Sequence, residues 1–129
     1  MRGFFRWAVV FVAICTASLS ALGVGVVREF QGSSNSTTAE FEVRAPWILD
    51  WRVNGEYSQA LGFEIELINA RTGRNDGQVL RTKRRGNGVR LFDQSGRYRL
   101  RITSSLAKWQ IKVEEISSED AKLYTPRGN

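Results

Sequence analysis

Histidine is absent from this sequence, and cysteine occurs only once among its 129 residues. Without histidine there is no imidazole general base, so nucleophile pairs of the Ser-His or Cys-His type and histidine metal ligands are excluded. A single cysteine excludes an intrachain disulfide and a cysteine-based zinc site. Any catalysis would therefore depend on carboxylates, and the length of the chain allows one domain.

The carboxylates offer two close pairs, Glu64 with Glu66 and Glu114 with Glu115. Glu64 and Glu66 would lie about 7 Å apart on one face of a strand, a separation that does not exclude a glycosidase-type arrangement. The abundant arginine of this region favours the ionised form of both groups, which disfavours a general acid. The short turn at 75–77 lacks the Asp/Asn-rich loop that calcium needs. The sequence thus predicts no enzyme, no cofactor and no metal.

The N-terminal segment combines arginine with a long uncharged run. Arg2 and Arg6 precede 21 uncharged residues, 7–27, and Arg28 ends the run. A helix of that length rises about 30 Å, which matches the bilayer core. We therefore expect residues 1–28 to be a signal-anchor or transmembrane segment that contacts the membrane through residues 7–27.

The charges also predict the orientation of this segment. Arg2 and Arg6 lie on one side of the apolar run, so the positive-inside bias keeps the N-terminus cytoplasmic and places the rest of the chain outside. The alternative is a secreted protein released by cleavage, because the small residues before positions 21 and 24 would suit a signal peptidase.

Composition divides the rest of the chain into three parts. Residues 29–38 are rich in Gly, Ser and Thr and are interpreted as a polar linker. Residues 39–116 contain the folded domain. Residues 117–129 form a C-terminal tail or a short helix, with Ser117 or Ser118 as its N-cap.

Apolar and polar residues alternate through the folded domain, which predicts half-buried antiparallel strands. Turn residues rich in Gly and Asn separate the runs, and no helix is available for parallel crossovers. We therefore predict an all-β antiparallel β-sandwich or jelly roll of about seven strands, preceded by a membrane helix or signal segment. The alternating runs are 41–45, 47–53, 61–67, 77–83, 89–92, 97–102 and 108–113.

Aromatic residues suggest one kind of ligand site. Trp47 and Trp51 share a strand face and would form a sugar-stacking platform if that face were exposed. Their phase matches that of Leu49 and Val53, which favours burial in the core. Tyr57 is expected in a loop and is the candidate ligand-stacking residue.

Arginine suggests a second kind of site. Residues 71–101 hold ten basic residues against two acidic ones, whereas residues 29–66 hold seven acidic residues against two basic ones. One interpretation is an anion site for a lipid headgroup or an acidic polysaccharide. The other, which we favour, is that Glu64, Glu66 or Glu114 on neighbouring strands neutralises the arginines. The candidate anion-binding residues are Arg97, Arg99 and Arg101 on one strand face, with Arg84 and Arg85 in a loop.

Two strand patterns follow each other near the end of the domain. The first is Gly96-Arg97-Tyr98-Arg99-Leu100-Arg101-Ile102, and the second is Trp109-Gln110-Ile111-Lys112-Val113. Residues 88–113 resemble the closing strands of small exported jelly-roll domains of the bacterial pre-peptidase C-terminal type. The resemblance implies a non-catalytic accessory sandwich. It does not imply calcium binding, because the acidic residues of that family's earlier strands are not matched.

Together these features predict a non-catalytic, membrane-anchored or exported β-sandwich that acts as a binding or structural module in the cell envelope. The alternative is a module that binds carbohydrate, anionic lipid or another polyanion through loop aromatics or the Arg97–Arg101 face. The expected partners are the membrane and an envelope protein, a glycan or an anionic lipid. Nucleic acid is not expected, because the domain would lie outside the cytoplasm.

Overall fold

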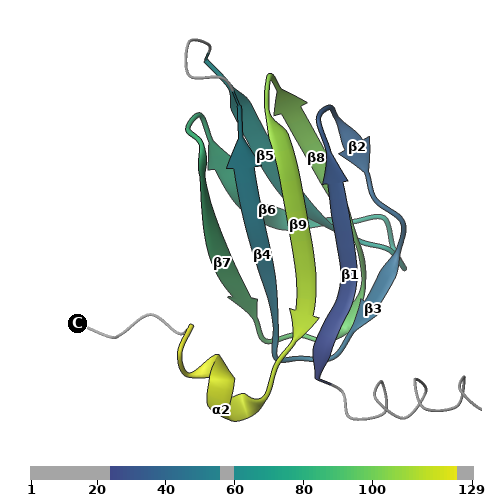
Figure 1. Cartoon of the computed structure of the whole chain (residues 1–129). Helices are drawn as coiled ribbons and strands as arrows, with labels where there is room; N and C mark the ends of the chain where they lie inside the picture. Colours follow the sequence, from purple (N-terminus) through teal and green to yellow (C-terminus); the bar gives the residue numbers. More distant parts are fainter. Residues whose placement is uncertain (1–23, 56–59, 125–129) are drawn as a thin grey trace, which may run out of the picture.

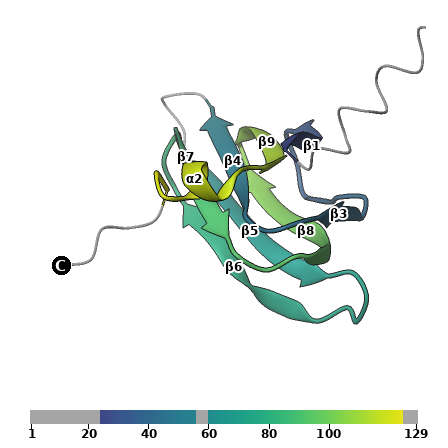
Figure 2. The ribbon, with the colours of Figure 1, turned by 90° about the horizontal axis from the view of Figure 1, so that it is seen from below.

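The computed structural model describes residues 24–55 and 60–124 of the chain. These residues form two antiparallel sheets packed face to face, as Figure 1 shows from the front and Figure 2 from below. The predicted all-β sandwich is therefore confirmed. Residues 1–23 of the anchor predicted over residues 1–28, and the loop residue Tyr57, lie outside the described residues. No helix in the described part of the chain is long and apolar enough to cross a membrane.

The two sheets share no strand, and all of their pairings are antiparallel. The first, called sheet A, has the order β1 (Gly25–Gly32), β9 (Lys108–Glu115), β4 (Trp47–Asn54) and β7 (Gly86–Phe92). The second, called sheet B, has the order β2 (Ser36–Thr37), β8 (Gly96–Ser105), β5 (Gly62–Asn69) and β6 (Asn75–Thr82), and β3 (Phe41–Val43) also pairs with β8.

The core lies between the sheets and is built by the inward positions of the alternating strands. Trp47 is completely buried, stacked on Phe92 with ring centroids 4.2 Å apart and edge-on to Phe41 at 6.1 Å. Trp51 is half-buried and packs against the same core. Trp47 and Trp51 thus both point toward the core, as their alternation with polar residues indicates, and neither ring forms an exposed platform. Burial, aided by the charge of Asp76, raises the pKa of the Tyr98 phenol.

The prediction of a linker over residues 29–38 is wrong, because most of this segment forms strands of the two sheets. β1 pairs with β9 along its whole length, from Gly25 opposite Glu115 to Gly32 opposite Trp109. β2 pairs with β8. Val27 and Phe30 are the only apolar side chains that β1 packs against the core, so its alternation is too weak to be seen in the sequence. The described sandwich therefore includes residues from Gly25 on, ahead of the predicted boundary at residue 39.

This start also shortens the segment expected in the membrane. Residues 25–27 belong to β1, which pairs with β9, so the uncharged residues before β1 are 7–24. A β-bulge at this point interrupts the register between Val26 and Arg28. At the other end of the chain, α2 (Ser118–Ala121) forms as predicted, with Ser117 as its N-cap accepting from the backbone N–H of Asp120.

An arginine bridges the edge strands β7 of sheet A and β6 of sheet B. Nη1 of Arg90 in sheet A donates to the backbone carbonyls of Gln78 and Val79 in sheet B, at 3.0 Å each. The same guanidinium lies 5.6 Å from the ring centroid of Phe92. Arg90 thus links the two sheets at the side where β7 is the edge strand of sheet A and β6 is the edge strand of sheet B.

Candidate functional site

The three arginines of β8 lie on the outer face of sheet B, beside carboxylates. Arg97 is 3.5 Å from Glu40 and 3.7 Å from Glu42, and Arg99 is 3.6 Å from Glu40. Arg101 is 3.5 Å from Glu66. Internal pairing was the favoured interpretation of the sequence, but two of the three partners come from β3 and the segment before it. Exposed ion pairs of this kind contribute little stability, although they leave the guanidinium groups occupied.

The carboxylates of β5 are held in the same network. The side-chain amide of Gln78 donates to Glu64 at 2.7 Å, and that of Asn75 donates to Glu66 at 2.9 Å. Both donors lie on β6, so hydrogen bonds cross the outer face of sheet B from β5 to its edge. Glu64, Glu66 and the three arginines of β8 are therefore all partnered on this face.

The structure separates the loop arginines from the β8 arginines. Arg84 lies in the exposed turn between β6 and β7, where its backbone exchanges hydrogen bonds with the hydroxyl of Thr82. Arg85 directly precedes β7 and lines a hollow on sheet A. The five arginines proposed from the sequence as one anion site are thus divided among the outer face of sheet B, an exposed turn and a hollow on sheet A.

The outer face of sheet A differs from that of sheet B. Four polar side chains lie opposite one another in a single row that crosses every strand of the sheet. No described residue forms a hydrogen bond or an ion pair with any of these side chains. We call these residues the cross-strand row: Gln31 on β1, Gln110 on β9, Arg52 on β4 and Asn87 on β7.

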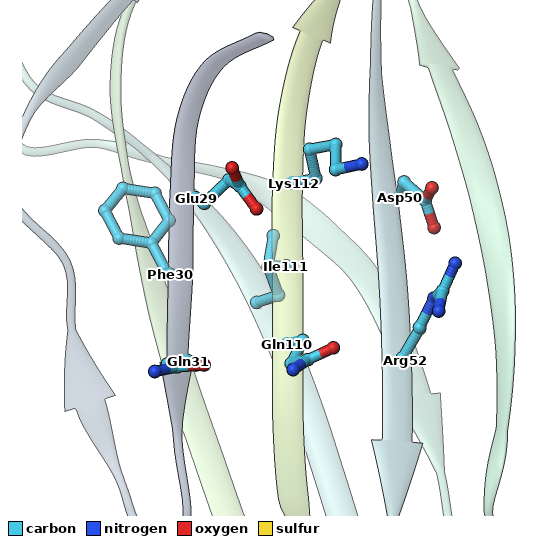
Figure 3. Close-up of a pocket in the computed structure, with 8 residues that line it drawn as sticks. All are labelled: Glu29, Phe30, Gln31, Asp50, Arg52, Gln110, Ile111 and Lys112. Atoms are coloured by element: carbon cyan, nitrogen blue, oxygen red, sulfur yellow. The ribbon is translucent and has the colours of Figure 1, made fainter.

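Two adjoining hollows flank the cross-strand row and share Gln31, Gln110 and Arg52. The smaller, called the narrow hollow, has a volume of about 400 Å³. Figure 3 shows its side chains standing on β1, β9 and β4, with charges of both signs. Its charged residues are Glu29, Asp50, Arg52 and Lys112.

The second hollow, called the wide hollow, has a volume of about 930 Å³ and lies at the end of sheet A remote from Gly25. The described residues that line it include three cations and no carboxylate. Amides and a hydroxyl complete its polar lining. These residues are Arg52, Arg85 and Lys108 as cations, with Gln31, Asn54, Asn87, Gln110 and Ser33.

The polar side chains of this face are hydrogen-bond donors and acceptors. Among residues 24–55 and 60–124, no three His, Cys, Asp or Glu side chains are close enough to hold a metal ion. An amide both donates and accepts hydrogen bonds, so it matches a hydroxyl group, which does the same. Arginine adds a planar fork of donors. The face can therefore bind a ligand that carries many hydroxyl groups along its length.

Comparisons with known proteins leave this site to be judged on its own geometry. No family model matches the chain, and neither a curated protein nor a solved structure gives a significant match.

Sequence reasoning missed this face because its members are scattered from residue 29 to residue 112. Arg52 and Gln110 were both visible as outward positions of alternating strands. Only the strand order, with β9 between β1 and β4, brings them opposite each other. The signal that could have found them is the set of outward amides on the strands of one sheet.

Proposed function

We propose that this chain is a non-catalytic binding module of the cell envelope, and that the outer face of sheet A binds a glycan. The observation that carries the proposal is the cross-strand row. Its side chains reach across the whole sheet, and no described residue bonds to them. A free row of this kind lets ligand hydroxyls replace water without breaking internal hydrogen bonds.

The composition of the face supports a glycan over a protein partner. The central region of a protein interface is usually apolar and rich in aromatic residues. Here the centre of the face is made of Gln31, Gln110 and Arg52, and the aromatic rings of sheet A point into the core. Two adjoining hollows also suit an extended chain of sugars better than a flat protein surface.

Binding to a printed glycan array, measured with the full-length chain in a mild detergent, tests this proposal. We expect Gln110→Ala to lower glycan binding at least tenfold, because Gln110 lines both hollows. Gln78→Ala is the matched control, since Gln78 lies on the outer face of sheet B and bonds to Glu64. Equal binding by the two variants, or no binding of the native chain to any glycan, would contradict the proposal.

We also propose that residues 7–23 hold the domain at a membrane, with the N-terminus in the cytoplasm. The support is the uncharged run 7–27 behind Arg2 and Arg6, of which the 17 residues 7–23 precede the described part of the chain. That length is near the short end of the range for a transmembrane helix, about 17–25 residues. Cell fractionation and mass spectrometry of the purified chain test it. We expect Met1 to be retained and the protein to remain with membranes; a soluble form that begins at Ala21 or Val24 would contradict the anchor.

A further inference from the structure

The two hollows on sheet A differ in charge. The narrow hollow mixes two carboxylates, Glu29 and Asp50, with cations, and both carboxylates lie directly opposite Lys112 on β9. Among the described residues, the wide hollow is lined by cations and uncharged groups alone. A chain of sugars lying along the face would therefore meet a nearly neutral surface at one end and a positive one at the other.

Two cations of the wide hollow are close enough to act on one group. Lys108 lies opposite Asn54, and Arg52 lies opposite Gln110, so Arg52 and Lys108 are diagonal neighbours on adjacent strands. Diagonal positions in an antiparallel pair are about 7–8 Å apart, a gap that one bound anionic group spans when both side chains turn toward it. No described residue pairs with either side chain. The positive charge of both is thus available to a ligand.

We infer that the wide hollow selects acidic glycans, with Arg52 and Lys108 binding the carboxylate or sulfate group of one sugar while the amides of the cross-strand row bind neighbouring hydroxyls. This inference rests on the proposed function and names its ligand class. Arg52 supplies a planar fork that can bind an oxyanion through two parallel hydrogen bonds. Lys108 supplies a second, compact charge.

The rest of the face supports an acidic glycan over other polyanions. A single-stranded nucleic acid needs exposed aromatic rings on which its bases stack, and the aromatic side chain in the wide hollow, Trp109, is only 4% exposed. An anionic membrane would need cations spread over a surface, whereas Arg52 and Lys108 lie in a hollow next to four amides. Amides interleaved with cations match a polymer that alternates hydroxyl and acidic groups.

The test uses the full-length chain in detergent and matched pairs of oligosaccharides: hexagalacturonate with its methyl ester, and a sulfated galactan hexamer with its desulfated form. We expect the acidic member of at least one pair to bind at least tenfold more tightly. Raising the salt concentration from 0.05 to 0.5 M should reduce this difference, because added salt screens exposed charges. The carboxylate and sulfate pairs distinguish the two sources of the anionic group.

Substitutions locate the effect. We expect the double variant Arg52→Gln, Lys108→Gln to remove the preference for the acidic member, so that the two members of a pair bind with affinities within twofold of each other. Arg97→Gln is the matched control, because Arg97 lies on the other sheet beside Glu40 and Glu42. It should leave the preference for the acidic member unchanged.

Three results would overturn the inference. The first is equal binding of acidic and neutral members in every pair. The second is a loss in Arg97→Gln as large as in the double variant. The third is tighter binding of an oligonucleotide or of phosphatidylglycerol vesicles than of any acidic glycan. Equal binding of both members that still depends on Gln110 would overturn this inference alone and leave the proposed function standing.

Discussion

Replacing Trp47 by alanine is expected to lower the free energy of unfolding by about 3–5 kcal/mol, the cost of removing a large aromatic ring from a packed core. Trp47 is 0% exposed, contacts Phe92, Phe41 and Tyr98, and donates its indole N–H to the carbonyl of Gln94 at 2.9 Å. A domain of this size has a total stability of about 5–15 kcal/mol. The loss would therefore remove a large part of it.

Urea denaturation measures this effect, and Trp51→Ala is the control on the same strand. Because Trp51 is only half-buried, its removal should cost clearly less. A Trp47→Phe variant keeps an aromatic ring beside Phe92 and loses the bond to Gln94, so it should lie between the native chain and the alanine variant. If Trp51→Ala proved as costly as Trp47→Ala, the packing described for β4 would be wrong.

Replacing Gly32 by alanine is expected to destabilise the fold by about 1–3 kcal/mol, the usual cost of forcing an extra carbon into a packed site. A Cβ atom at residue 32 would lie 2.6 Å from Cζ2 and 3.0 Å from Cε2 of Trp109, which faces Gly32 across the β1–β9 pair. The indole would have to move. That movement would weaken the hydrogen bond that the indole N–H of Trp109 donates to the carbonyl of Ser34 at 3.2 Å.

Gly62→Ala is the matched control, because its Cβ would meet only the Cβ of Ser105 at 3.9 Å. That variant should leave the thermal midpoint almost unchanged or raise it slightly, since alanine restricts the unfolded chain more than glycine does. Thermal unfolding followed by circular dichroism compares the two. An equal midpoint for Gly32→Ala and Gly62→Ala would show that β1 does not pack on Trp109 as described.

The alternating strands were predictable because each buries one face. In β5, for example, Phe63, Ile65 and Leu67 are buried and the residues between them are partly exposed. β1 was not predictable, since its inward positions include the small residue Gly32 and a bulge at Val27 that breaks the period of two. Its polar residues match a linker in composition, and only the partner strand β9 makes them a strand.

The candidate site was less predictable than the fold, because it depends on which strands become neighbours. Arg97, Arg99 and Arg101 were seen as one face, yet the contact of Arg97 with Glu42 requires β3 to pair with β8. The cross-strand row needs the order of all four strands of sheet A. Alternation fixes which way a side chain points along its own strand and carries no information about the strand beside it.

The position at which β1 begins would set the distance between the proposed anchor and the proposed binding face. If residues 7–23 form the proposed anchor, only residue 24 separates it from the strand that begins at Gly25. β1 runs from this end of the sandwich to Gly32, which lines the wide hollow, a span of roughly 23 Å for eight extended residues. With such an anchor, the wide hollow would lie roughly 23 Å along β1 from the membrane end of the strand, and a polymer would have to come close to the bilayer to be bound.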